Sequence, residues 1–286
     1  MKLDINMLKE TPQDFEQAVK VHSQLELNGE FNTDENENSI EGCEPVTVEF
    51  PFIRKGLKYS IKHAIYTRAY KWYANKINKE LTNLKVVGKE NLKGIKAGII
   101  TCNHISKVDN FAIRAAVGMD IMFVAAEFNN WKGPMGDIAR HTGYIPISST
   151  LDRNIMRKTN EAIEYYLKKN KRILIYPEQA MWREYKKPRP MKNGAFHYAI
   201  KHKVPIIPLF ITIEDKVEKM DEQGRMNFGD YTIHILKPIY PNKDLSNKEN
   251  IDYLRQENFR QWKEVYEKTY GIPLEYTTLD KSKIKI

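Results

Sequence analysis

The residues of this chain best suited to chemistry are His104 and Asp109, which follow the apolar run 97–102. An aspartate that holds one ring nitrogen of a histidine stabilises the imidazolium, and the other nitrogen can then act as a general base near neutral pH. On a regular helix, residues five positions apart point about 140° away from each other, so the pair can meet only if His104 lies on a turn before the helix. Asn103 and Ser106 favour such a turn. The pattern predicts a proton-transferring pair, with a surface or structural histidine as the alternative.

Three further blocks follow this pair in a fixed order. They read Gly-Tyr-Ile-Pro-Ile at 143–147, Tyr-Pro-Glu at 176–178 and Val-Pro-Ile-Ile-Pro at 204–208. Together with the Asn-His-x4-Asp block, they make residues 84–215 resemble the glycerolipid acyltransferase family. Members of that family move a fatty acyl group from a thioester to the hydroxyl of a lysophospholipid or glycerol phosphate. The resemblance implies an acyl-CoA or acyl carrier protein thioester as co-substrate and no cofactor.

The resemblance also assigns roles to individual residues. It implies that His104 is the general base, that Asp109 orients it, and that Glu178 belongs to the acceptor site. The same two blocks supply further implied substrate-binding residues, which are Asn103, Ser106 and Gln179.

The chain departs from the family pattern at two arginines. Met181 stands where the family's Pro-Glu-Gly-Thr-Arg block has its arginine, and Ser149 replaces the arginine of the second block. Because the guanidinium fork matches phosphate oxygens, another cation must take their place if the acceptor carries a phosphate. Arg153 and Arg183 are the nearest candidates in the sequence, and we predict that they bind the substrate. A solvated charged loop is the alternative for the basic run after Glu178.

Charge is unevenly distributed along the chain. Residues 1–50 carry 3 Lys and 12 Asp or Glu, whereas the whole chain of 286 residues has a net charge of +9. The remaining body is therefore strongly basic and would attract polyanions, anionic lipid and nucleic acid alike. The chain shows no signature of a nucleic-acid-binding fold. An anionic membrane surface is the predicted partner, and nucleic acid is not.

The segment 53–79 indicates how a membrane surface would be contacted. Apolar residues recur in it mostly at steps of three or four, while lysines and arginines take the other positions. This composition is typical of a helix that lies in the bilayer interface, as N-terminal helices of the resembled family often do. The alternative is an amphipathic helix that packs on the protein's own core. The apolar positions are Ile53, Leu57, Ile61, Ile65, Ala69, Trp72, Tyr73 and Ile77.

The expected location follows from features that the sequence lacks. No stretch reaches the ~18 consecutive apolar residues that a membrane-spanning helix needs, and residues 1–20 lack the apolar core of a secretory signal. We therefore expect a peripheral protein on the cytoplasmic face of the membrane.

Cys43 and Cys102 are the only cysteines, which excludes a disulfide framework. The seven histidines show no metal-ligand spacing, and no metal is expected.

Cys102 offers a second possible mechanism. Residues two apart on a strand face the same way, so Cys102 and His104 could form a nucleophile and base pair. A buried structural cysteine is the favoured interpretation, since free cysteine is among the residues most often buried in apolar surroundings. Direct transfer to the acceptor hydroxyl is therefore predicted, with main-chain N–H groups after His104 as candidate oxyanion donors.

Apolar runs alternate with amphipathic helical stretches from residue 84 onward. This alternation predicts an α/β fold with a mainly parallel central sheet flanked by helices. We expect an acidic N-terminal segment and flexible linker at 1–50, a basic membrane-docking helical element at 51–83 and an acyltransferase domain at 84–286. Strands are predicted at 84–88, 97–102, 121–125, 172–176, 206–213 and 231–240, helices at 1–25, 110–117, 154–169, 193–202 and 251–270, and the linker at 26–45.

The sequence thus predicts an O-acyltransferase of phospholipid synthesis that acylates a lysophosphatidate-like glycerolipid. The two missing arginines would also suit a different acceptor, such as a glycolipid or a cell-wall precursor. If the protein is not an enzyme, the alternative function is that of a non-catalytic basic module that binds anionic lipid or nucleic acid.

Overall fold

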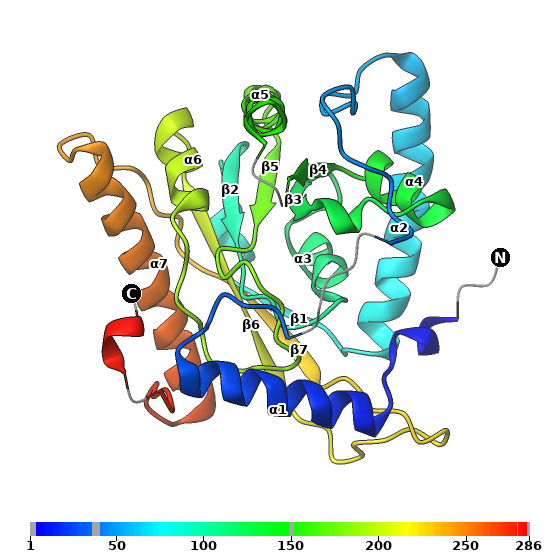
Figure 1. Cartoon of the computed structure of the whole chain (residues 1–286), viewed down its shortest axis with the longest axis vertical. Coiled ribbons are helices and arrows are strands. Elements are labelled where there is room, and N and C mark those ends of the chain that lie inside the picture. The colour runs from blue at the N-terminus through cyan, green and yellow to red at the C-terminus, as the bar shows by residue number, and fades with distance from the viewer. Residues whose placement is uncertain (1–3, 36–40, 149–151, 279, 285–286) are drawn as a thin grey trace.

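The computed structural model describes residues 4–35, 41–148, 152–278 and 280–284. Its centre is a seven-stranded sheet in the order β1-β7-β6-β2-β5-β3-β4 (Figure 1). β6 and β7 pair antiparallel, and the other neighbouring strands pair parallel. The predicted α/β fold with a mainly parallel sheet is therefore confirmed. The strands are β1 (Lys85–Val87), β2 (Gly98–Thr101), β3 (Met122–Ala126), β4 (Tyr144–Ile147), β5 (Arg172–Ile175), β6 (Ile206–Glu214) and β7 (Asp230–Ile235).

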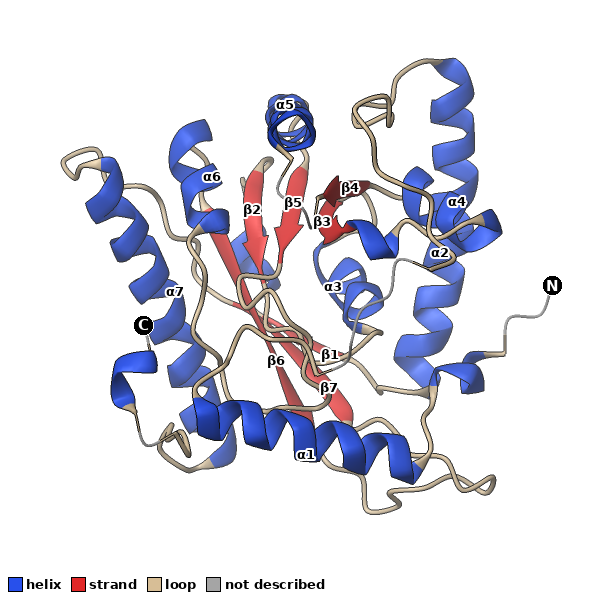
Figure 2. Ribbon diagram, in the orientation of Figure 1, coloured by secondary structure: helices blue, strands red, loops and turns tan. Residues whose placement is uncertain are grey.

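Helices flank the sheet, with α6 and α7 to its left and α2 and α4 to its right in Figure 2. The side chains of Thr11, Asp152 and Ser246 each accept a main-chain N–H at the start of a helix, and Ser246 forms a full capping box with Glu249. The α-helices are α1 (Pro12–Asn28), α2 (Leu57–Glu80), α3 (Asp109–Val117), α4 (Gly133–His141), α5 (Arg153–Lys168), α6 (Gly194–His202) and α7 (Asn247–Tyr270), and the short 3-10 helices are η1 (Ile5–Leu8), η2 (Lys89–Leu92), η3 (Glu127–Asn129) and η4 (Lys281–Lys283).

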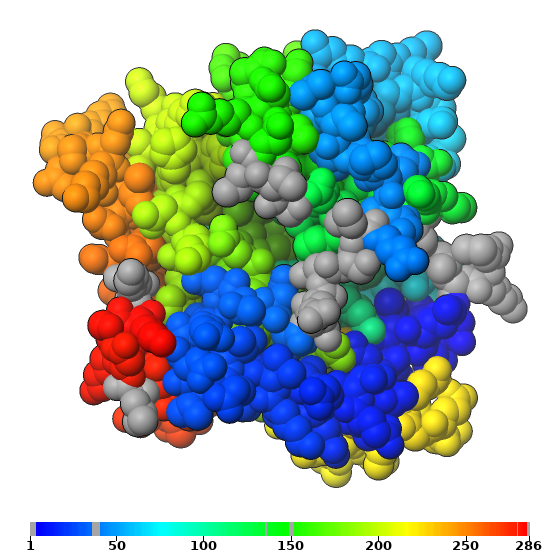
Figure 3. Space-filling model, viewed as in Figure 1, coloured from blue at the N-terminus to red at the C-terminus, as the bar shows by residue number. Residues whose placement is uncertain are grey.

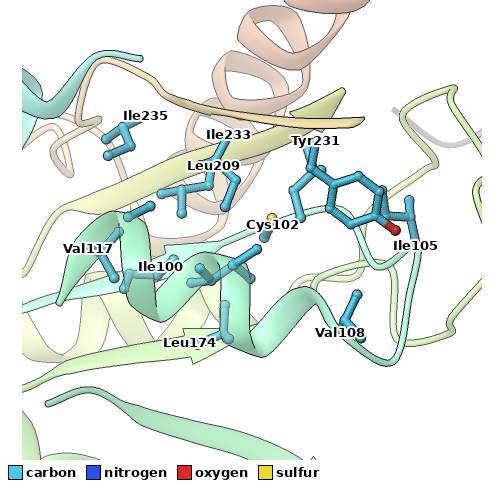
Figure 4. Packing of buried hydrophobic residues seen from close by; sticks show 14 of the residues in the cluster. Ile100, Cys102, Ile105, Val108, Val117, Leu174, Leu209, Tyr231, Ile233 and Ile235 are labelled. Carbon is cyan, nitrogen blue, oxygen red and sulfur yellow. The ribbon is translucent and has the colours of Figure 1, made fainter. Parts of the chain in front are cut away.

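Two hydrophobic clusters, one on each face of the sheet, hold these layers together. Successive residues of a strand point to opposite faces, so Ile100 packs in the cluster with α2 and α3, and Ile99 packs in the one with α5, α6 and α7. Figure 4 shows the first cluster, where Ile100 and Cys102 lie among side chains of α3, β6 and β7. Both residues are fully buried, which fixes the register of β2 at the centre of the sheet.

The sequence analysis assigns no element to residues 133–147, where the structure has α4 and β4. Gly133, Pro134 and Gly136 are weak helix formers, and Pro146 is unusual within a strand. Tertiary packing overrides these local preferences, because β4 pairs with β3 and is covered by α5.

The described part of the predicted linker is packed against the α/β body. α1 crosses the side of the molecule toward which the arrows of β2 and β5 point (Figure 1). Phe31 and Glu35, which follow α1, are buried, and the ring of Phe31 stacks on Trp182 with the centroids 6.1 Å apart. Residues 26–35 of the predicted linker thus lie against the body, while 36–40 lie outside the described residues.

Candidate active site

His104 and Asp109 meet at the carboxyl end of β2. The strand ends at Thr101, the following turn carries His104, and α3 begins at Asp109. The ring Nδ1 of His104 lies 2.9 Å from Oδ2 of Asp109. His104 therefore occupies the turn before the helix, as the five-residue spacing requires.

Three N–H groups converge on the Asp109 carboxylate. Besides the His104 ring, Oδ2 accepts main-chain hydrogen bonds from Ile105 at 2.9 Å and from Ser106 at 3.0 Å. Burial raises the pKa of Asp109, while the hydrogen bonds from His104, Ile105 and Ser106 act in the opposite direction by favouring the charged form. Oδ2 keeps a proton on Nδ1 of His104, so that Nε2 is left as the basic nitrogen. The N–H groups of Ile105 and Ser106 are occupied by this contact and are not oxyanion donors.

Tyr176, the residue after β5, covers one face of the His104 ring. The two ring centroids are 3.9 Å apart and the planes differ by 12°. This stacking restrains the imidazole, while 25% of the His104 side chain stays exposed for a substrate. The sequence analysis includes Tyr176 in a block but gives it no role. The contact depends on β2 and β5 being neighbours, which the order of the strands in the sequence does not specify.

Glu178 supports the active-site loop from behind. Its side chain is fully buried. Oε2 accepts the main-chain N–H of His104 at 3.0 Å, and Oε1 accepts the main-chain N–H of Arg189 at 2.9 Å. The structure thus places Glu178 differently from the acceptor-binding position that the family resemblance implies: it holds the main chain of His104.

Arg189 is a buried cation that the sequence analysis includes in a basic run without a role. Its Nη2 donates to Oε2 of Glu178 at 2.7 Å and to the carbonyl oxygens of Ala180 at 2.5 Å and His104 at 3.3 Å. Its guanidinium also lies over the Trp182 ring, 4.5 Å from the centroid. Glu178 and Arg189 together therefore hold both the N–H and the carbonyl of His104. No local signal separates this fully buried arginine from the partly buried Lys186 and Lys187 of the same run.

The three other predicted substrate-binding residues of these blocks have different environments. Asn103 is buried, and its side-chain amide exchanges two hydrogen bonds with the main chain of Ile211, which ties the end of β2 to β6. Ser106 accepts the N–H of Val108 and lines a cavity beside the loop. Gln179 is exposed and has a φ of 64°, a left-handed conformation in which the family's glycine is favoured.

The cavity beside the loop brings together cations from both active-site blocks. Lys107 and Arg183 line it, as does Met181, which occupies the position of the missing family arginine. Arg153, by contrast, is exposed at the start of α5 and is not among the lining residues. Ser149 lies outside the described residues. Of the two predicted replacement arginines, the structure brings only Arg183 to this cavity.

Cys102 does not face the active site as a nucleophile. It is fully buried in the cluster of Figure 4, where its neighbours include Ile100 and Val108. Burial, followed by the nearby carboxylates of Asp109 and Glu178, raises the pKa of the thiol well above its ordinary value. The thiolate that nucleophilic attack would need is therefore disfavoured.

Cys102→Ser should accordingly leave turnover nearly unchanged, because the thiol takes no part in direct transfer. Activity per folded protein, with folding checked by circular dichroism, measures the effect. Trapping of an acyl-cysteine at Cys102, or loss of activity in a folded variant, would contradict direct transfer.

Two absences in the described residues bear on the chemistry. They hold no group of three or more His, Cys, Asp or Glu side chains arranged to bind a metal ion. Within the same ranges, no helix combines the length and apolar composition that a membrane crossing requires.

Comparison with known proteins relates this geometry to a family. Residues 83–212, which contain His104, Asp109 and Glu178, match the family model described as Acyltransferase. The segment that carries the active-site loop is thus similar to the acyltransferase family. It is 30% identical over 161 residues to a 1-acyl-sn-glycerol-3-phosphate acyltransferase of Saccharomyces cerevisiae, covering 55% of this chain and 52% of that one. A Limnanthes douglasii enzyme of the same name is 26% identical over 129 residues, which is 45% of each chain.

This acyltransferase chain thus spans about half the length of the curated relatives it matches. A solved structure resembles it more widely. The crystal structure of the 1-acyl-sn-glycerophosphate acyltransferase PlsC from Thermotoga maritima aligns with a TM-score of 0.56, covering 88% of this chain and 94% of that one at 17% identity. At this identity the likeness establishes the shared acyltransferase fold. The predicted family is confirmed.

Proposed function

We propose that this protein is an O-acyltransferase that moves a fatty acyl group from an acyl-CoA or acyl carrier protein thioester to the hydroxyl of a lysophosphatidate-like glycerolipid. The observation that supports this most directly is the 2.9 Å contact between His104 and Asp109 within the segment that matches the acyltransferase family. The contact leaves Nε2 of His104 as a general base in a partly open ring.

The proposed reaction needs only this base and the two substrates. Nε2 of His104 takes the proton of the acceptor hydroxyl while the hydroxyl oxygen attacks the thioester carbonyl carbon, and a tetrahedral oxyanion forms. Asp109 stabilises the imidazolium that results. When the intermediate collapses, the carbon–sulfur bond breaks, and the thiolate leaves with the proton from the imidazolium. The products are the acylated glycerolipid and the free thiol.

A direct assay tests this function. Purified protein is incubated with labelled acyl-CoA or acyl carrier protein thioester and a panel of lysolipids, and the acylated products are identified. We expect diacylated phosphatidate from lysophosphatidate, with no product from His104→Ala. Acylation of a glycolipid or cell-wall precursor alone would indicate the other acceptor class. No product with any acceptor, together with binding to anionic lipid or nucleic acid, would indicate a non-catalytic module.

We further propose that the protein is attached peripherally to an anionic membrane, on its cytoplasmic face, through the first four turns of α2. Leu57, Ile61, Ile65 and Trp72 are all more than half exposed. With 3.6 residues per turn they fall within an arc of about 80° around the helix. Ile77, at the end of the helix, instead packs in the core. The opposite face of α2 packs on the protein, where the rings of Tyr66 and Tyr70 stack on His141 and Phe111. The alternative of core packing therefore describes that face and not the exposed stripe.

The charges around this exposed stripe favour a lipid surface. Lys58 and Lys71, both exposed, flank it on opposite sides of the helix at about 100° and −40° from Leu57. Apolar side chains in the interface and lysines at the depth of the lipid phosphates are the two features of a helix that lies on a membrane. An aromatic ring such as that of Trp72 suits the headgroup region.

Changing Leu57 and Trp72 together to glutamate should release the protein from anionic liposomes in a flotation assay, since both apolar burial and attraction of the lysines are weakened. High salt should weaken binding of the unmodified protein. The matched control changes Tyr240 and Ile272, two comparably exposed apolar residues outside α2, to glutamate. We expect that control to float like the wild type. Equal flotation of both double variants would remove α2 as the attachment site.

A further inference from the structure

A glutamate from the N-terminal segment contacts both cations of the cavity beside the active-site loop. Glu10 lies between η1 and α1. Its Oε1 is 2.8 Å from Nζ of Lys107, and its Oε2 is 2.6 Å from Nη1 of Arg183. One carboxylate is thus held between two cations that come from different active-site blocks.

The two cations are arranged as a site for an anion. Lys107 lies three residues after His104. The residues on either side of Arg183 are bonded to the same loop, because the main-chain N–H groups of Trp182 and Glu184 donate to the carbonyls of His104 at 3.1 Å and Ile105 at 2.9 Å. Glu35, which is buried, accepts from Nε of Arg183 at 2.7 Å and from its main-chain N–H at 2.8 Å. That contact holds one edge of the guanidinium and aims Nη1 at Glu10. A planar fork and an ammonium that converge on one point can contact several oxygens of a phosphate.

We propose that Lys107 and Arg183 form the subsite for the phosphate of the acceptor, and that the Glu10 carboxylate is an intramolecular occupant that the phosphate displaces. This inference rests on the proposed function. Glu10 pairs with both cations, and a phosphate dianion added beside it would be repelled by it. Because Asp14, Glu35 and Glu184 also line this region, a further anion can enter only if the Glu10 carboxylate leaves. The same subsite supplies the cation that Met181 cannot provide.

The carboxylate of Glu10 can leave the subsite, whereas that of Glu35 stays bonded to Arg183. The Glu10 side chain is 20% exposed, whereas that of Glu35 is 1% exposed. The main chain of Glu10 is held separately, because its carbonyl accepts the N–H of Met226 at 2.8 Å. A change of side-chain rotamer can therefore empty the subsite while α1 stays in place over this face of the molecule, where Figure 3 shows the N-terminal segment in blue.

Binding of sn-glycerol 3-phosphate, measured by titration calorimetry, tests the subsite without turnover. Glu10→Gln should bind it about tenfold more tightly than the wild type, since the competing charge is removed and the side-chain shape is kept. Lys107→Ala should bind it about tenfold more weakly. The matched control is Glu16→Gln, the same change at an exposed position of α1, which should bind like the wild type. Unchanged affinity in both Glu10→Gln and Lys107→Ala would overturn the proposal.

Kinetics separate failure of the subsite from failure of the enzyme function. Glu10→Gln should lower the KM for lysophosphatidate several-fold and leave the KM for monoacylglycerol unchanged. Wild-type acylation of lysophosphatidate with no shift in Glu10→Gln would refute the subsite and keep the function. Tighter glycerol phosphate binding in Glu10→Gln with no acylation by the wild type would keep the subsite and refute the function.

Discussion

Replacing His104 with alanine should lower turnover by roughly 10²-fold or more, the loss expected when a general base is removed. The fold should survive, because the ring is a quarter exposed and the loop is held through its main chain. Asp109→Asn should also lose most of the activity, since an amide 2.9 Å from Nδ1 cannot stabilise the imidazolium. The measurement is kcat with an acyl thioester and lysophosphatidate.

The two residues should behave as one unit. Combining His104→Ala with Asp109→Asn should therefore cost little more than either change alone. His197→Ala is the matched control, because His197 is an exposed histidine on α6, outside the active-site loop. Circular dichroism checks that each variant is folded. If His104→Ala kept as much activity as His197→Ala, His104 would not be the base.

Arg189→Ala should lower the free energy of unfolding by ~3 to 5 kcal/mol, because it leaves the Glu178 carboxylate buried without its cation. Both side chains are 1% exposed and 2.7 Å apart, so water cannot replace the lost partner. At temperatures where the variant is still folded, turnover should also fall, since the carbonyl of His104 loses a donor. Urea unfolding followed by circular dichroism measures the stability.

An exposed ion pair provides the comparison. Arg157→Ala removes a pair with Glu161 on α5 in which both side chains are more than 40% exposed, and it should cost no more than ~1 kcal/mol. Adding Glu178→Gln to Arg189→Ala should recover part of the lost stability, because the unpaired buried charge is removed. A destabilisation by Arg189→Ala no larger than that by Arg157→Ala would show that the buried pair does not hold the loop.

Features that depend on near neighbours in the chain could be predicted from the sequence. His104 and Asp109 could be paired because five residues across one turn limit where their side chains can go. Alternation of apolar runs gave most of the strands and helices, since burial of β2 on both faces requires apolar residues throughout. The pattern of α2 could be recognised for the same reason, although periodicity alone could not say which face of the helix packs on the protein.

The contacts by which distant segments complete the site depend on how the elements pack. Glu178 and the N–H of His104 are 74 positions apart, and they meet because β2 and β5 are paired in parallel. Arg183 and Glu35 are 148 positions apart, and their contact depends on how the N-terminal segment packs over the carboxyl ends of the strands. Composition shows that this segment is acidic and the body basic, but charge attraction acts at a distance without specifying partners. Burial and hydrogen-bond geometry select those partners. The roles of Glu178, Arg189 and Glu10 therefore follow from the three-dimensional contacts and could not be predicted from the sequence.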